Sequence, residues 1–547
     1  MLNQGSLKNR QLPVSGVNVW AAYHSIFITL VLCVAGLAAV YVANSTSSVR
    51  TNGEPLGVAL ALALLFMALR RWQFGVQALL VVVIVEGALR KWFLPSYADL
   101  VYFYKDALMA AVLIAYFLER GKAKVIIQRE LQFFVIPLFA LVIYAFAISA
   151  NPRAPHLVTS LFGVKAYCLY MPLAFLLPRM FSTKEKLVGF LRWYLVIALM
   201  VAAVGAWQFI DNSQDSSLNR YAQSENPSEL PQDTAIFADS SGDYFVRVTG
   251  TFSFISGLTV YLPVAFSLLL GLTSLGATRT LPLSVRLIYY LGIAGVVATA
   301  FMSGSRAVIA NLVLITMIFF AFTSLNNAFK RLRQVVIGGA LVFLTLNLIA
   351  PNAVDGVYQR AFGGDEQIDE GRERIVAVFA FPFEEAAYAG PFGYGIGATQ
   401  NSVPALMNRL NLTPTGEAIP ITVESESSRV MLELGVVGFV LFTLVRLATL
   451  VATLRGSLVI RDPELKALAV ASFASLLFSI VAGGAVINHT QNVYQWFLVG
   501  MVFAVLNADR LARSTKPLLA NPIKGACRGG TPWPPLVTAR FNFKDLC

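Results

Sequence analysis

The sequence predicts an all-α protein that crosses a membrane many times. Hydrophobic residues make up 57 % of the 547 residues and charged residues 13 %, whereas soluble globular chains have about 45–50 % and about 25 %. The mean hydropathy is +0.66. A soluble core cannot bury this much apolar surface, so lipid is predicted to surround most of the chain. The composition excludes a disordered chain, a collagen, a disulfide-rich scaffold and an ordinary cytosolic enzyme.

Fourteen apolar segments are predicted to form the membrane helices, each of which needs about 20 residues to cross a bilayer. Those before residue 211 are 20–43, 55–69, 74–89, 100–118, 131–150, 157–177 and 187–210. Those after it are 254–275, 287–302, 307–323, 335–350, 430–450, 467–486 and 493–506. The first is predicted to remain as an anchor, because it is too long for the core of a signal peptide.

Alternate loops are rich in Lys and Arg, which places those loops and both termini in the cytoplasm. The net charge of +12 is assigned to these loops and not to nucleic-acid binding. The predicted layout is a cytoplasmic tail (1–19), helices one to seven (20–210), an outer loop (211–253), helices eight to eleven (254–350), a large outer loop (351–429), helices twelve to fourteen (430–507) and a cytoplasmic tail (508–547).

Ionisable residues lie inside several predicted spans, mostly near the outer ends, and such residues are usually functional or paired. The clearest are Glu86, Lys105, Asp106, Lys165 and Glu433. One interpretation is a polar cavity that opens to the outer face. The other is internal pairing, of Glu86 with Arg90 or of Lys105 with Asp106 through neighbours, and we favour it for these groups because complementary charges are already adjacent.

Arginines on the outer side are stronger functional candidates, because most have no neighbouring acid. The segment SGSR (303–306) ends one span and begins the next. Ser303 and Ser305 are predicted N-caps, and a helix start that carries Arg306 is suited to bind an anion. A tight turn with an arginine that extends to the interface would give the same sequence.

Glycines alternate in PFGYGIG (391–397), a pattern that fits either backbone amides close to a phosphate or sugar, or a plain structural turn. Glu424 and Glu426 lie just before a span, which is also where acids gather at helix starts. The chain has only three histidines, and no metal site or other cofactor is predicted. His489, at an outer helix junction, is expected to form hydrogen bonds at an interface.

The order of these stretches resembles the O-antigen polymerase/O-antigen ligase superfamily, roughly over residues 157–507. The stretches are RVTGTF (247–252), SGSR (303–306), GR (371–372), PFGYGIG (391–397) and ELGVVG (433–438). EGALRKW (86–92) is similar to a stretch of the exopolysaccharide-polymerase-like branch. The resemblance implies an enzyme of the bacterial inner membrane, with its long outer loops in the periplasm.

Such an enzyme would polymerise undecaprenyl-pyrophosphate-linked repeat units without a nucleotide sugar or metal, alongside a flippase and a chain-length regulator. The resemblance implies that outer arginines hold the pyrophosphate leaving group; the candidates are Arg247, Arg306, Arg360, Arg372 and Arg374. Arginine suits this task because its fork binds phosphate in a bidentate manner. Possible supporting residues are Ser303, Ser305, Lys165, Tyr394 and His489.

Ligase members carry a His-Asn-type pair where this chain has Glu424, two residues before Glu426. This difference favours a polymerase and makes one of these carboxylates the candidate general base, with Arg306 as the third catalytic residue. Two alternatives stay open: a ligase-type glycan transferase, and a flippase or other transporter of lipid-linked oligosaccharide. A transporter would be expected to show inverted repeats and broken helices, and the sequence shows neither.

Overall fold

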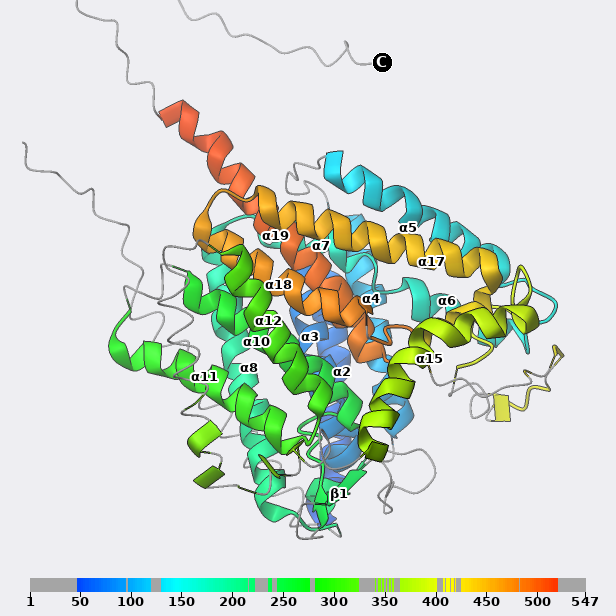
Figure 1. Cartoon of the computed structure of the whole chain (residues 1–547), viewed down its shortest axis with the longest axis horizontal. Helices are drawn as coiled ribbons and strands as arrows, with labels where there is room; N and C mark the ends of the chain where they lie inside the picture. Colours follow the sequence, from blue (N-terminus) through cyan, green and yellow to red (C-terminus); the bar gives the residue numbers. More distant parts are fainter. Residues whose placement is uncertain are drawn as a thin grey trace, which may run out of the picture.

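Helices dominate the computed structural model, and about 80 % of the residues that it describes are helical (Figure 1). It describes residues 47–94, 97–119, 129–214, 216–221, 235–238, 244–275, 281–323, 365–400, 425–481 and 483–519, with short pieces between 340 and 358 and between 407 and 419. Within these ranges the strands form one two-stranded antiparallel sheet. The prediction of an all-α membrane protein is confirmed at this level.

The helices of the first half are α2 (Ser47–Arg70), α3 (Trp72–Ala88), its π-helical continuation η1 (Leu89–Phe93), α4 (Ala98–Leu118), α5 (Arg129–Ile148), α6 (Leu157–Cys168), α7 (Leu173–Met180) and α8 (Lys184–Asp211). Those of the second half are α10 (Ile255–Ser274), α11 (Leu283–Met302), α12 (Arg306–Phe322), α15 (Asp365–Ala389), α17 (Glu426–Val459), α18 (Pro463–Val481) and α19 (His489–Leu519). Between the halves lie η3 (Ser217–Asn219), β1 (Ile236–Ala238) and β2 (Tyr244–Val246).

Eight helices of the described ranges are long and apolar enough to cross a bilayer, and three shorter apolar helices accompany them. The predicted span 20–43 lies outside the described residues, as does most of 335–350. The other predicted spans coincide with described helices, α6 and α7 together accounting for one of them. The count of fourteen therefore stays a prediction. We call the end at which α4, α6, α12 and α19 begin the predicted outer end.

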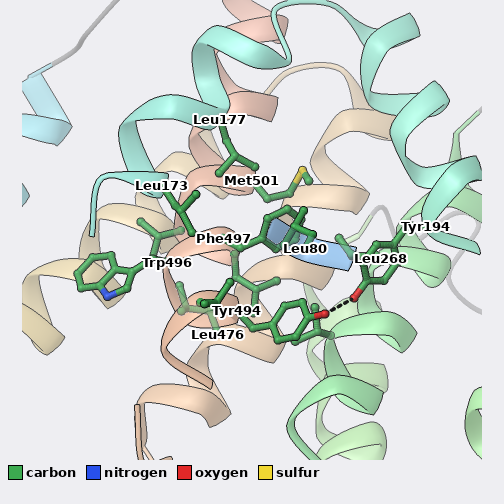
Figure 2. Packing of buried hydrophobic residues seen from close by; sticks show 14 of the residues in the cluster. Leu80, Leu173, Leu177, Tyr194, Leu268, Leu476, Tyr494, Trp496, Phe497 and Met501 are labelled. Atoms are coloured by element: carbon green, nitrogen blue, oxygen red, sulfur yellow. Dashed lines mark hydrogen bonds between the residues drawn. The ribbon is translucent and has the colours of Figure 1, made fainter. Parts of the chain in front are cut away.

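Helix α19 lies at the centre of the packing and contacts α7, α10, α17 and α18. Figure 2 shows its side chains Tyr494 and Phe497 among buried residues of the neighbouring helices, with the hydroxyls of Tyr494 and Tyr194 3.4 Å apart. Small residues allow close approach: a Cβ on Gly500 would lie 2.6 Å from the carbonyl oxygen of Leu173 in α7. In lipid such close packing, more than exclusion of water, holds helices together.

Helix α17 is broken at Gly435, where φ is 69° and ψ is −174°. The side chains of Glu426 and Arg446 form an ion pair although they are 20 residues apart. Along an unbroken helix that separation would be about 30 Å, so the segment 426–434 folds back beside the next three turns. This finding corrects the expectation of unbroken helices. It also starts α17 at Glu426, earlier than the predicted residue 430.

The two predicted outer loops each hold regular structure. In the first, β1 and β2 pair antiparallel, with Phe237 opposite Phe245. In the second, α15 packs against α17. Figure 1 shows α15 running across the bundle, at the end where α12 and α19 begin. Whether these loops lie in the periplasm stays a prediction.

Candidate functional site

The end of α3 and the stretch 247–253 pack directly against each other. The backbone N–H of Ala88 donates to the carbonyl of Thr251 at 2.7 Å, and Lys91 Nζ donates to Thr249 Oγ1 at 2.8 Å. A Cβ on Gly87 would lie 2.0 Å from the backbone of Phe252, so only glycine allows this approach. Two stretches that carry the family resemblance are thus in contact, although far apart in the sequence.

Gln208 holds the same stretch from α8 and is 1 % exposed. Its Oε1 accepts from the backbone N–H groups of Thr249 at 3.1 Å and Gly250 at 2.7 Å. Its Nε2 donates to the carbonyl of Leu218 at 2.8 Å. Sequence reasoning missed this residue, although a glutamine near the end of an apolar span is a signal that could have found it.

Arg247 meets the SGSR turn: its Nε donates to the carbonyl of Ser303 at 3.2 Å. The predicted capping is wrong in part. Ser303 ends α11, where its hydroxyl donates to the carbonyl of Ala300 at 2.7 Å. Ser305 takes the N-cap position of α12, but its side chain makes no capping hydrogen bond. Gly304 between them has a φ of 61°, which favours glycine. The structure thus brings Arg247 to the turn that ends at Arg306.

The buried charges beside this site are paired between helices. Lys105 Nζ lies 2.6 Å from Glu86, whose other oxygen is 3.7 Å from Arg90. Lys165 Nζ lies 2.6 Å from Asp106. The predicted pairing of Glu86 with Arg90 is confirmed, whereas Lys105 and Asp106 do not pair directly with each other and each pairs with a residue of another helix. Adjacent residues of a helix point in different directions and do not face each other.

The ring of Tyr102 joins these charges to the start of α19. The Nζ of Lys105 lies 4.0 Å from its centroid and that of Lys165 lies 5.5 Å away. The ring of His489 packs edge-on against Tyr102 at 5.6 Å, and His489 is 7 % exposed. Phe162 contacts both Lys165 and His489. Lys165 and His489, predicted separately as supporting residues, are therefore neighbours.

The glycine-rich stretch 391–397 is packed against the break in α17. The N–H of Tyr394 donates to the carbonyl of Leu432 at 2.7 Å, and that of Gly395 donates to the carbonyl of Glu433 at 3.1 Å. A Cβ on Gly393, whose φ is 67°, would lie 2.5 Å from the Leu432 carbonyl oxygen. These amides are engaged by the protein itself, which favours the structural turn. The guanidinium of Arg153 lies 4.1 Å from the centroid of the Tyr394 ring.

Carboxylates of the folded-back segment are buried and engaged. Glu426 is 4 % exposed and Glu433 is 0 % exposed. One oxygen of Glu426 accepts from the N–H of Val486 at 2.6 Å, and the other pairs with Arg446. Glu433 Oε1 accepts from the N–H of Thr399 at 3.0 Å and from its hydroxyl at 2.7 Å. Both carboxylates accept hydrogen bonds from backbone N–H groups that would otherwise be unpaired.

A cavity of about 20 Å³ lies beside the Glu426–Arg446 pair, which is room for one water molecule. Its lining includes Tyr167, Asn492 and Gln495. Asn492 Oδ1 and Gln495 Oε1 have no hydrogen-bond partner among the described residues, whereas the Tyr167 hydroxyl lies against Glu433. A water there would satisfy the two amide oxygens. These residues are not among those predicted from the sequence, although the two amides interrupt an apolar helix.

Several predicted residues lie beyond these contacts. Arg360 and Glu424 are outside the described residues. Arg372 and Arg374 belong to α15, and their side chains are also outside the described part. Where side chains are described, no three His, Cys, Asp or Glu gather as metal ligands would. Comparisons with protein-family models, with curated proteins and with solved structures find no match to this chain.

Proposed function

We propose that this protein is a membrane glycosyltransferase that polymerises undecaprenyl-pyrophosphate-linked oligosaccharide repeat units into a surface polysaccharide. One observation carries the proposal: the sequence stretches that resemble the polymerase/ligase superfamily pack against one another in two groups. Residues 86–92 contact 247–253, Arg247 contacts the 303–306 turn, and 391–397 contacts the break at Gly435. Stretches that only formed separate local turns would not be expected to contact each other.

The chemistry needs cations where charge develops. An acceptor hydroxyl attacks the anomeric carbon, its proton passes to a base, and the bond from that carbon to the pyrophosphate oxygen breaks. Arg247 and Arg306 are proposed as pyrophosphate ligands at the SGSR turn, with Arg372 and Arg374 on α15 and Arg360 before it. Loss of one such contact is expected to lower the rate on the order of 10²–10³-fold, as for one oxyanion-hole donor.

Glu424 and Glu426 are the proposed candidates for the general base, and an ion pair constrains Glu426. Glu426 is paired with Arg446, so it must leave that pair before it can accept a proton. Glu424→Gln, Glu426→Gln and Arg446→Gln separate the roles when polymer length is normalised to protein level. A base makes its own variant inactive, and if Glu426 is the base the double variant Glu426→Gln/Arg446→Gln is inactive as well. If Glu426 is purely structural, the double variant leaves no uncompensated charge and is more active than Arg446→Gln.

The topology is part of the proposal: an inner-membrane protein with cytoplasmic termini and periplasmic loops at 211–253 and 351–429. The alternation of Lys- and Arg-rich loops supports it. A topology reporter fused near Gly416 should behave as periplasmic. A cytoplasmic signal would refute the mechanism, because lipid-linked repeat units would then lie on the other side.

The decisive experiment is deletion of the gene, followed by sizing of the surface glycan. A polymerase deletion leaves single repeat units, and complementation by Arg306→Ala should leave the same short product. The exposed Arg455 at the other end of α17 provides the control, Arg455→Ala, which should restore full length. Long chains in the deletion strain, or in the Arg306→Ala strain at normal protein level, would contradict the proposal.

A second candidate is a transporter of lipid-linked oligosaccharide, which the break in α17 favours because broken helices are typical of transporters. The same deletion distinguishes it. Without a transporter, repeat units stay on the cytoplasmic leaflet and no glycan, not even a single repeat, reaches the surface. A ligase deletion would instead leave long glycan chains that are still lipid-linked.

A further inference from the structure

Helix α15 exposes a set of large aromatic side chains. Phe379 is 61 % exposed and Phe383 72 %, and Val376, three residues before Phe379, is 48 % exposed. Spacings of three and four residues place these side chains on one face of the helix, which we call the aromatic face. Soluble surfaces seldom expose a contiguous apolar face of this kind. The helix lies outside the candidate membrane spans, so a bundle-core or transmembrane position does not explain them.

Another side of α15 is already packed. Pro382, Glu385 and Ala389 are buried, and Ala389 belongs to a small apolar cluster with Tyr394 and Leu432. These contacts fix α15 on α17. The exposed rings are therefore not a face that would close onto this bundle, and they need a different neighbour.

The exposed rings of α15 continue the surface that α17 presents to lipid. The rings of Phe383 and Phe439 are 6.4 Å apart. Next to Phe439, Val436 and Val440 are 41 % and 51 % exposed on an apolar helix, as residues in contact with lipid are. Figure 1 shows α15 lying across the end of the bundle, crosswise to α12 and α19.

We propose that the aromatic face of α15 inserts into the interfacial layer of the membrane at the predicted outer end. Phenylalanine is typical of the apolar face of helices that lie at this depth. A helix held in this way lies in the plane of the interface, with its apolar face among the headgroups and upper acyl chains. The occupant is therefore the bilayer itself.

The position of α15 also bears on the pyrophosphate ligands, and this step rests on the proposed function. Arg372 and Arg374 lie on the same helix, about two turns or less before Phe379. If α15 lies at the membrane interface, the two arginines lie within about 10 Å of the plane of that interface. The pyrophosphate of a lipid-linked substrate lies at the same level, because its polyprenyl chain remains in the bilayer.

The test places a nitroxide spin label at Phe383→Cys, in full-length protein whose four native cysteines are replaced by serine. The protein is reconstituted in vesicles of phosphatidylethanolamine and phosphatidylglycerol. Collision with oxygen, which concentrates in lipid, is compared with collision with a water-soluble nickel chelate. The matched control is Glu384→Cys, which is also exposed but points about 100° further round the helix.

We expect the label at 383 to collide several-fold more with oxygen relative to nickel than the label at 384. A label at 383 that favours nickel, as at 384, would overturn the proposal. Dipolar broadening between labels at 383, which signals a second copy on this face, would overturn it as well. The readout does not depend on catalysis, so an inactive or differently acting protein with a lipid-inserted α15 would refute only the proposed function.

Discussion

The ion pair between Glu426 and Arg446 is expected to hold the folded-back segment 426–434 in place. It joins the first turn of α17 to a turn beyond the break at Gly435. Glu426 is 4 % exposed, and its second oxygen accepts only the N–H of Val486 among the bonds described. Arg446→Gln therefore leaves a carboxylate that is buried without its counter-charge.

Removing one partner of a buried ion pair costs about 3–5 kcal/mol, because the remaining charge stays desolvated. At about 1.4 kcal/mol per tenfold change in an equilibrium constant, the open state of the segment should become roughly 10²–10³-fold more populated. The double variant Glu426→Gln/Arg446→Gln should open less than Arg446→Gln alone, since it leaves no uncompensated charge.

Hydrogen–deuterium exchange of the purified protein measures this opening directly. Peptides that cover 426–434 should exchange roughly 10²–10³-fold faster in Arg446→Gln, by the equilibrium above, while peptides from α10 keep their protection. Arg455→Gln, an exposed arginine of the same helix, is the matched control and should change neither. Unchanged protection of 426–434 in Arg446→Gln would refute the role assigned to the pair.

Three further predictions concern single sites. Gly393→Ala should lower the thermal unfolding temperature and loosen 391–397 in limited proteolysis, because its Cβ would lie 2.5 Å from the Leu432 carbonyl oxygen at a φ of 67°. Gly87→Ala should reduce folded protein recovered in detergent, whereas Gly189→Ala, whose Cβ meets nothing within 4 Å, should not. Burial raises the pKa of the Glu385 carboxyl, against a hydrogen bond with Ser428 that lowers it. A raised carboxyl pKa removes stability as pH rises above the unfolded value of about 4.3, so Glu385→Gln should unfold at a higher temperature than the parent at pH 7 and lose that advantage near pH 4. An equal advantage at both pH values would contradict the assignment.

Hydropathy was sufficient to place the apolar helices that the structure describes, because a stretch of about 20 apolar residues has few other options in a chain this hydrophobic. The predicted span 254–275 differs by one residue at each end from α10 (Ile255–Ser274). The same reasoning failed at the start of α17. Residues 426–429 are polar and were assigned to a loop, yet they form a buried helical turn. Their burial depends on Arg446 and on the N–H of Val486, which no local window contains.

In the candidate site, too, contacts within one helix were predictable from the sequence and contacts between helices were not. Helical spacing predicted the Glu86–Arg90 pair, because residues four apart share a helix face. It could not predict that Lys105 reaches Glu86 or that Lys165 reaches Asp106, since those pairs depend on how helices pack. The glycines of 391–397 left two interpretations open. Carbonyl groups of α17 accept hydrogen bonds from the amides of this stretch, which favours the interpretation as a structural turn.

The break in α17 links two parts of the candidate site mechanically. Just after Gly435, the N–H groups of Val436 and Val437 donate to the carbonyls of Gly390 and Pro391, at the end of α15. A bond of this kind is costly to leave unmade where water is scarce, so α15 cannot shift without moving the break or losing these bonds. Under the proposed function, α15 carries two pyrophosphate arginines and the folded-back segment carries Glu426. Binding of the pyrophosphate to the arginines of α15 would then shift the carboxylate of Glu426.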